Sequence, residues 1–212
     1  MNTPPAPVRY TGTGFALTND GYFVTSYHVT KGADSVYIQD HNGEYFKASK
    51  YAFDENADLV IMKVEKKNFR FGKGEIPYSF ASGKSGLGTH IYTVGYPNDF
   101  AVYSEGYVSA KNGFEGNDQQ YTLELPAGHG QSGSPVLDEK GNVLGVLTAI
   151  SSEEEENTYA VSSKTLIDIL HKELPDDNTI RLPKSNKMGR MSSEERAKKM
   201  ELYTFSVKVY KK

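Results

Sequence analysis

Short β-prone runs separated by turn residues occupy most of the chain between residues 10 and 149. The first two, residues 14–17 and 22–25, flank an Asn-Asp-Gly sequence at 19–21, and Asp-Gly between two such runs is a strong signal for a β-hairpin. Many short strands at this spacing predict an all-β sandwich or barrels. Similar runs follow at residues 35–39, 45–51, 59–64, 90–95, 103–110, 120–125 and 143–150.

A helical pattern appears only after these runs. Ser162 or Ser163 can cap a helix at 162–174 that carries several leucines on one face. The 212 residues are 37% hydrophobic, which is enough for the core of one globular domain of about 170 residues. We therefore expect one domain at residues 10–174, closed by that helix and preceded by an extended, proline-stiffened leader at residues 1–9.

The composition changes after Pro175, where a polar linker begins. Ser192 and Glu195 have the spacing of a capping box at the start of a short charged helix, and residues 203–210 alternate like a strand. Residues 175–212 are therefore expected to form a linker, a short helix and an extra strand. Three roles remain open for them: a strand added to the edge of the domain, a contact for assembly, or the start of a further segment.

Charge and cysteine content exclude several classes of function. The net charge is −3 with acidic and basic residues intermixed, and no apolar run approaches the roughly 20 residues needed to cross a bilayer, so we expect neither nucleic-acid binding nor a membrane span. The absence of cysteine rules out a disulfide scaffold and a thiolate zinc site. No histidine cluster has metal-ligand spacing, and no cofactor is expected. Residues 1–9 lack the pattern of a signal peptide.

A candidate nucleophile lies in the glycine-rich segment at residues 128–135. Ser132 stands between Gln131 and Gly133 and precedes Pro135 and an apolar run, an arrangement that suits a tight loop feeding a strand. Gly130 can adopt backbone angles closed to other residues, so its N–H and that of Ser132 can converge on one point as an oxyanion hole. The alternative is a glycine-rich hairpin before a buried strand.

A serine needs a base and an orienting acid before it can act as a nucleophile. His28 directly follows the apolar strand at 22–25, and Asp58 begins the apolar run 59–64. Either residue alone would be interpreted as structural. His28, Asp58 and Ser132 all lie at strand ends, which is where the residues of a cleft between barrels have to lie. This joint placement indicates a catalytic triad.

Several motifs together resemble those of a known family. They are residues 12–15, 28–30, 57–63, 94–97, 106–109, 130–135 and 159–163. The chain resembles chymotrypsin-fold serine proteases, closest to the bacterial HtrA (Deg) branch, from about residue 11 to residue 173. This resemblance implies two six-stranded antiparallel β-barrels, at about residues 10–75 and 76–161, with the active site between them. It also implies His28 as general base, Asp58 as orienting acid and Ser132 as nucleophile.

Departures from the family pattern predict how the enzyme is controlled and what it cleaves. Gln131 replaces the aspartate that pairs with a new N-terminus in zymogens, so activation by N-terminal cleavage is not expected. Pro126 occupies the place of the trypsin-type carboxylate, and an uncharged pocket base favours small or apolar P1 side chains. The expected substrate-binding residues are Pro126, His129, Thr148, Ala149, Ile150, Asn157 and Thr158.

The resemblance leaves some properties of the protein open. Residues 175–212 are too few for the PDZ domain that usually follows an HtrA protease domain. The resemblance to HtrA proteases favours a periplasmic or otherwise extracytoplasmic location. The expected activity is that of a serine endopeptidase acting on protein or peptide substrates. The alternatives are a catalytically idle relative that only binds peptides or partners, and an esterase that uses the same triad.

Overall fold

A β-hairpin begins the described part of the chain. In the computed structural model, which describes residues 10–150, 157–174 and 180–211, β1 (Tyr10–Ala16) pairs antiparallel with β2 (Tyr22–Ser26). Gly21 in the connecting turn has φ +106°, a left-handed conformation that favours glycine. The hairpin predicted from the Asp-Gly pair is therefore present.

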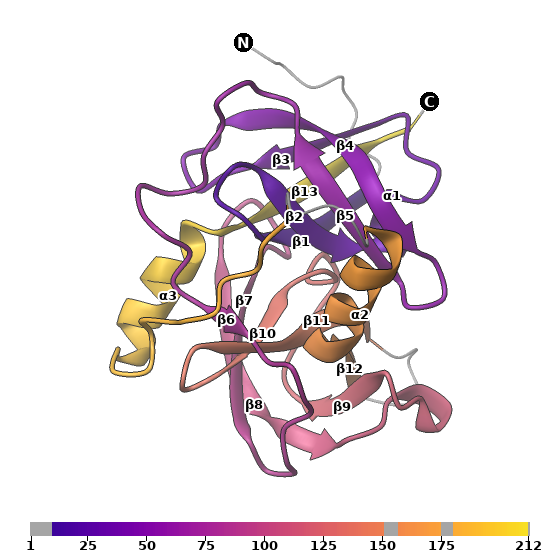
Figure 1. Ribbon diagram of the computed structural model, residues 1–212, viewed down its shortest axis with the longest axis vertical. Helices are drawn as coiled ribbons and strands as arrows, with labels where there is room; N and C mark the ends of the chain where they lie inside the picture. Colours follow the sequence, from indigo (N-terminus) through magenta and orange to yellow (C-terminus); the bar gives the residue numbers. More distant parts are fainter. Residues whose placement is uncertain (1–9, 151–156, 175–179, 212) are drawn as a thin grey trace.

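The first barrel closes with a strand from the other end of the chain. Its remaining strands are β3 (Ser35–Gln39), β4 (Tyr45–Asp54), β5 (Leu59–Val64) and β13 (Thr204–Tyr210). The closed order is β1-β13-β3-β4-β5-β2, and β13 is antiparallel to both β1 and β3. In Figure 1 the yellow strand β13 accordingly lies among the indigo and violet strands of this barrel.

This closure differs from the boundaries expected from the sequence. The expected barrel at residues 10–75 contains five of the six strands, and the sixth comes from the tail instead of from this range. All seven residues of β13 are buried, because alternate side chains such as Phe205 and Val207 fill the barrel while the others face outward against neighbouring structure. The tail strand is thus an integral part of the barrel wall and not an addition to an exposed edge.

The second barrel also has six strands. They are β7 (His90–Gly95), β8 (Val102–Ala110), β9 (Gln120–Glu124), β10 (Pro135–Asp138), β11 (Asn142–Ile150) and β12 (Thr158–Ser162). Strand β10 closes the barrel by pairing with both β7 and β11, and the two-residue β6 (Ser79–Phe80) adds to β11 in parallel. A 3₁₀ turn, η1 (Phe114–Gly116), lies between β8 and β9. The expected all-β fold of two six-stranded barrels is confirmed.

Two helices join the barrels. Helix α2 (Ser163–Glu173) has Ser162 as its N-cap and contacts β11 and β12 of the second barrel and β4 of the first. Helix α3 (Ser193–Glu201) begins with the expected capping box of Ser192 and Glu195, and it contacts β13 and β7. Each helix therefore holds one barrel against the other. The remaining helix, α1 (Tyr27–Thr30), is a single turn that follows β2.

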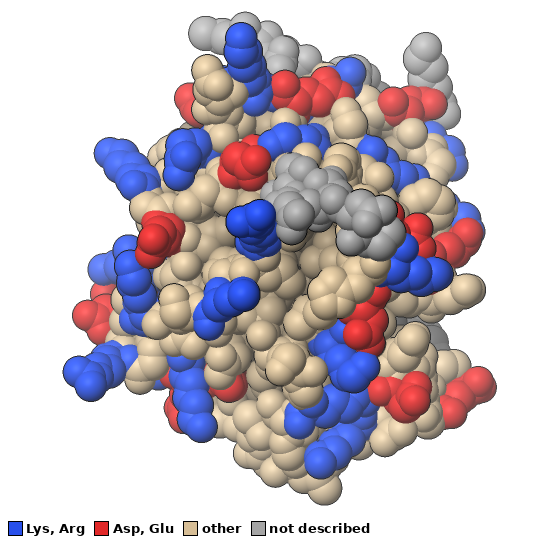
Figure 2. Space-filling view, in the orientation of Figure 1, with Lys and Arg blue, Asp and Glu red and all other residues tan. Residues whose placement is uncertain are grey.

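The charged side chains on the face drawn in Figure 2 are of both signs and lie close to one another. This agrees with the intermixed charges of the sequence and its net charge of −3. Within the described ranges, none of the helices has the length and apolar character that a membrane-spanning helix needs.

Candidate active site

His28 is presented by the short helix α1, which starts directly where β2 ends. Its side chain is half exposed, and its Nδ1 lies 2.7 Å from Oδ2 of Asp58. The backbone N–H of His28 also donates to Oδ1 of Asp58, at 2.8 Å. One carboxylate therefore holds both the ring and the backbone of His28, and this fixes the orientation of the imidazole.

Asp58 lies in a strained turn before β5. Its φ of +55° is in the left-handed region, which non-glycine residues rarely adopt, and its carbonyl accepts the N–H of Tyr27 at 3.0 Å. A third donor to its carboxylate is the hydroxyl of Thr148, which bonds Oδ2. With three donors arranged around it, the carboxylate is held in one position at the base of α1.

Ser132 lies in the loop between β9 and β10, on the second barrel. Gly130 and Gly133 in this loop have φ of +87° and +93°, and Gly133 donates its N–H to the carbonyl of Leu147 at 2.7 Å. The Ser132 carbonyl accepts the N–H of Thr13 at 2.8 Å, which ties the loop to the first barrel. The Ser132 hydroxyl donates to the carbonyl of Thr148 at 3.4 Å, a long and weak hydrogen bond.

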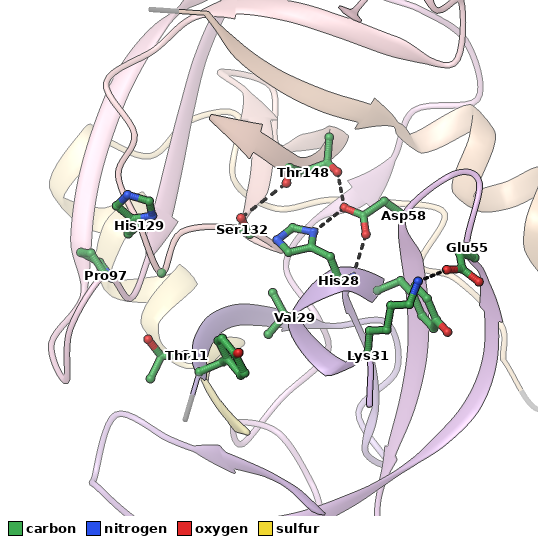
Figure 3. A pocket seen from close by; sticks show the side chains of 13 residues that line it. Thr11, His28, Val29, Lys31, Glu55, Asp58, Pro97, His129, Ser132 and Thr148 are labelled. Atoms are coloured by element: carbon green, nitrogen blue, oxygen red, sulfur yellow. Dashed lines mark hydrogen bonds and ion pairs between the residues drawn. The ribbon is translucent and has the colours of Figure 1, made fainter. Parts of the chain in front are cut away.

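The three residues line one pocket of about 900 Å³ between the barrels. Figure 3 shows His28 and Asp58 joined on one side of it and Ser132 facing it from the other barrel. In the described residues the Ser132 hydroxyl is bonded to Thr148 and not to His28. The sequence-predicted residues in the pocket lining are His28, Asp58, His129, Gly130, Ser132 and Thr148.

Pro126, Asn157 and Thr158 lie outside this described lining, and the side chains of Ala149 and Ile150 lie outside the described part of the structure. Thr158 is buried on β12, and its hydroxyl donates to the carbonyl of Leu125 at 2.9 Å. Pro126 follows Leu125 and is exposed, and Asn157 is half buried just before β12. Ala149 and Ile150 belong to β11, where their backbones pair with Tyr159 and Thr158. These residues therefore cluster on three neighbouring segments beside the pocket.

The backbone around Ser132 leaves two amide groups available. Among the described residues, the N–H groups of Gly130 and Ser132 donate to no acceptor. Free N–H groups next to a candidate nucleophile are the arrangement that an oxyanion hole requires.

Sequence reasoning missed the role of Thr13, which connects the two barrels beside the pocket. The Thr13 hydroxyl donates to the carbonyl of Gly130 at 2.8 Å and accepts the N–H of Tyr96 at 2.9 Å. Thr13 is fully buried on β1, so both bonds are shielded from water. A threonine between two glycines gave no sign of these partners, because both lie more than 80 residues away along the chain.

An ion pair forms another part of the lining of the active-site pocket. Lys31 bonds the carboxylate of Glu55, and this neighbour raises the pKa of Lys31. Both side chains are more than half exposed, so the pair contributes little to stability. Within the described part of the chain, no group of three or more metal-binding side chains is present.

Comparisons with known proteins identify the family. The trypsin-like peptidase domain family matches residues 12–146, more than half of the chain. A protein from Chlamydia muridarum named "Probable periplasmic serine endoprotease DegP-like" is 30% identical over 152 residues, which is 66% of this chain and 28% of that protein. The magnetosome formation protease MamE of Paramagnetospirillum magneticum is 32% identical over 161 residues, or 70% of this chain and 21% of MamE. The chain thus spans less than a third of the length of these two relatives.

A solved structure shows the same fold. The serine endoprotease from Yersinia pestis has a TM-score of 0.67 at 21% identity, covering 82% of this chain and 61% of that one. The resemblance to the HtrA (Deg) branch is confirmed by the DegP-like relatives. On the strength of the family match over residues 12–146, this chain belongs to the family of trypsin-like peptidase domains.

Proposed function

We propose that this chain is a serine endopeptidase in which Ser132 is the nucleophile, His28 the general base and Asp58 the orienting acid. The observation that carries the proposal is the His28–Asp58 pair in the same pocket as Ser132, at the junction of the two barrels. The relatives named as serine endoproteases support the same activity.

In this mechanism Asp58 accepts a hydrogen bond from the Nδ1–H group of His28, which keeps the proton on Nδ1 and leaves the lone pair on Nε2 free to act as a base. The Ser132 hydroxyl turns from Thr148 toward this nitrogen, gives up its proton and attacks the peptide carbonyl carbon. His28 then transfers the proton to the leaving amine as the C–N bond breaks. Water repeats the sequence on the acyl-enzyme and regenerates Ser132.

The negative charge that develops on the carbonyl oxygen is stabilised by the N–H groups of Gly130 and Ser132. Their lack of an acceptor among the described residues supports this role. Loss of one such donor typically lowers the kcat of a serine protease by about 10²–10³-fold.

A fluorophosphonate probe tests the proposed function directly. Such probes label only an activated serine, so intact-mass measurement is expected to show one adduct on the wild-type chain and none on Ser132→Ala. The thermal unfolding midpoint of Ser132→Ala should match that of the wild type, which shows that the fold is retained. A folded wild-type chain that takes up no probe would contradict the proposal and favour a peptide-binding module.

The substrate preference proposed here is for small or apolar P1 side chains. Pro126 carries no charge, and the neighbouring residues Leu125, Ala127, Asn157 and Thr158 are uncharged too. A lysine side chain bound there would therefore lose water without gaining a carboxylate partner.

Internally quenched peptides that differ only at P1 measure this preference. We expect kcat/KM to be at least about tenfold higher for Val or Ala than for Lys at P1, because Pro126 and its described neighbours provide no counter-charge. An ester substrate with the same P1 residue serves as the control that separates peptidase from esterase activity. Faster cleavage after Lys than after Val would overturn the assignment.

A further inference from the structure

Lys208 is a buried cation on the closing strand of the first barrel. Its side chain is 8% exposed, and its ammonium group pairs with the carboxylate of Asp99, which is 75% exposed. Asp99 belongs to the loop at residues 96–101, which connects β7 and β8 of the second barrel. The pair therefore joins the tail strand of one barrel to a loop of the other.

The pairing constrains the loop because a buried ammonium group needs a counter-charge. In the described residues, the Lys208 ammonium has Asp99 as its one hydrogen-bond and ion-pair partner. Moving Asp99 away would leave the cation buried without compensation, which is strongly unfavourable. The ion pair with Lys208 of β13 therefore restrains Asp99.

The same loop packs against the proposed oxyanion hole. A Cβ atom placed on Gly130 would lie 2.9 Å from both Cα and the carbonyl oxygen of Pro97, and 3.1 Å from the carbonyl oxygen of Tyr96. Pro97 also lines the active-site pocket, as Figure 3 shows. The loop backbone is therefore in direct contact with the Gly130 peptide.

The start of the loop is fixed separately. The Thr13 hydroxyl accepts the N–H of Tyr96 and donates to the carbonyl of Gly130, so one hydroxyl joins the loop to the residue whose N–H is proposed to line the oxyanion hole. Lys208 holds the loop three residues further on, at Asp99. Two neighbouring strands, β1 and β13, thus hold the segment that lies against Gly130.

We propose that Lys208 is a positioning residue for the oxyanion hole: through Asp99 it keeps residues 96–101 packed against Gly130, so that the Gly130 N–H stays directed into the pocket. This inference rests on the proposed function, because it assigns a role in the same reaction. It makes the tail strand part of the catalytic machinery as well as part of the barrel.

Kinetics of Lys208→Met and Lys208→Arg test the proposal. Methionine keeps the apolar stem but removes the charge, and we expect kcat to fall about 10- to 100-fold with KM changed less than about threefold. Arginine keeps the ion pair and should restore most of kcat. Affinity for a peptidyl aldehyde, which places an oxyanion in the hole, should fall in parallel with kcat, whereas affinity for a cleaved product peptide should not.

A double-mutant cycle tests whether the effect passes through Asp99. Asp99→Asn should lower kcat like Lys208→Met, and the double variant should lose no more than either single variant. An unchanged kcat in Lys208→Met would overturn the inference, and so would a loss of kcat that is fully additive with that of Asp99→Asn. Fluorophosphonate labelling of the wild-type chain in the same experiment would show that the proposed function still holds.

Hydrogen exchange provides a readout that needs no activity. In a Ser132→Ala background, where self-cleavage is prevented, Lys208→Met should speed amide exchange in residues 96–101 and 128–132 relative to Ser132→Ala alone. Exchange in β5, which lies opposite β13 in the closed order of the barrel, is the internal control. Identical exchange in the two loops would count against the proposal even if the chain proved to be inactive.

Discussion

An asparagine at position 58 is expected to lower kcat about 10⁴-fold while the protein remains folded and still binds substrate. Asparagine is nearly the same size as aspartate and is among the residues that best tolerate positive φ. The turn at φ +55° should therefore survive the substitution. Only the hydrogen bonding around the side chain changes.

The loss of activity follows from the donor and acceptor pattern at this carboxylate. In the wild type, Oδ1 of Asp58 accepts the backbone N–H of His28. The amide oxygen of asparagine is therefore expected to occupy the position of Oδ1, and its NH₂ group is expected to occupy the position of Oδ2. The NH₂ group then faces His28 Nδ1, which must present a lone pair and carry its proton on Nε2 instead. An imidazole in that tautomer cannot accept the proton of Ser132.

Steady-state kinetics with one quenched peptide, alongside thermal unfolding, measure the effect. Ser132→Ala gives the lower limit of activity, and Asp58→Asn is expected to lie slightly above it with a similar unfolding midpoint. KM should change little, because Asp58 contacts His28 and Thr148 within the protein. A kcat within tenfold of the wild type would show that Asp58 does not control the tautomer of His28.

The strand pattern of the sequence predicted an all-β sandwich or barrels, and the resemblance to chymotrypsin-fold proteases implied two six-stranded barrels with the triad candidates in the cleft between them. Strand runs and turn residues are local features, and His28, Asp58 and Ser132 each stand at the end of a local apolar run. Such patterns can be recognised in the sequence without knowledge of the tertiary structure. This is why the fold class was accessible from one sequence.

Contacts between distant segments were not accessible in this way. Thr148 was expected to bind substrate, but nothing in the sequence indicated that its hydroxyl donates to the carboxylate of Asp58, 90 residues earlier. The alternation in residues 203–210 predicted a strand, but nothing local indicated that its partners would be β1 and β3. Pairing of this kind depends on the closure of the barrel, which a local pattern does not encode.

Removal of the tail strand is expected to abolish folding. Phe205 and Val207 are 1% and 0% exposed, and Phe205 packs against the rings of Phe23 and Phe71 at centroid distances of 5.1 and 5.0 Å. Burial of each such side chain contributes about 1.5–3 kcal/mol, whereas a whole domain is stable by about 5–15 kcal/mol. Deletion would also expose the hydrogen-bonding edges of β1 and β3.

A chain ending at residue 202 should therefore lack a cooperative thermal transition and remain unlabelled by a fluorophosphonate. Val207→Asp in the full chain tests the same point with one side chain, because it places a carboxylate inside the barrel. Ser206→Ala is the matched control on the outward face, and it should unfold close to the wild-type temperature. A truncated chain with the wild-type transition would show that five strands suffice.

Complementation with a separate peptide distinguishes a required strand from a merely stabilising tail. A synthetic peptide of residues 203–211 carries the whole of β13, and pairing with β1 and β3 would give it backbone hydrogen bonds on both sides. Added to the truncated chain, it is expected to restore the thermal transition and probe labelling in a saturable manner, whereas the same peptide with Asp at position 207 should not. A peptide with Met at position 208 is expected to restore the transition but to give slower labelling, since it closes the barrel without pairing with Asp99.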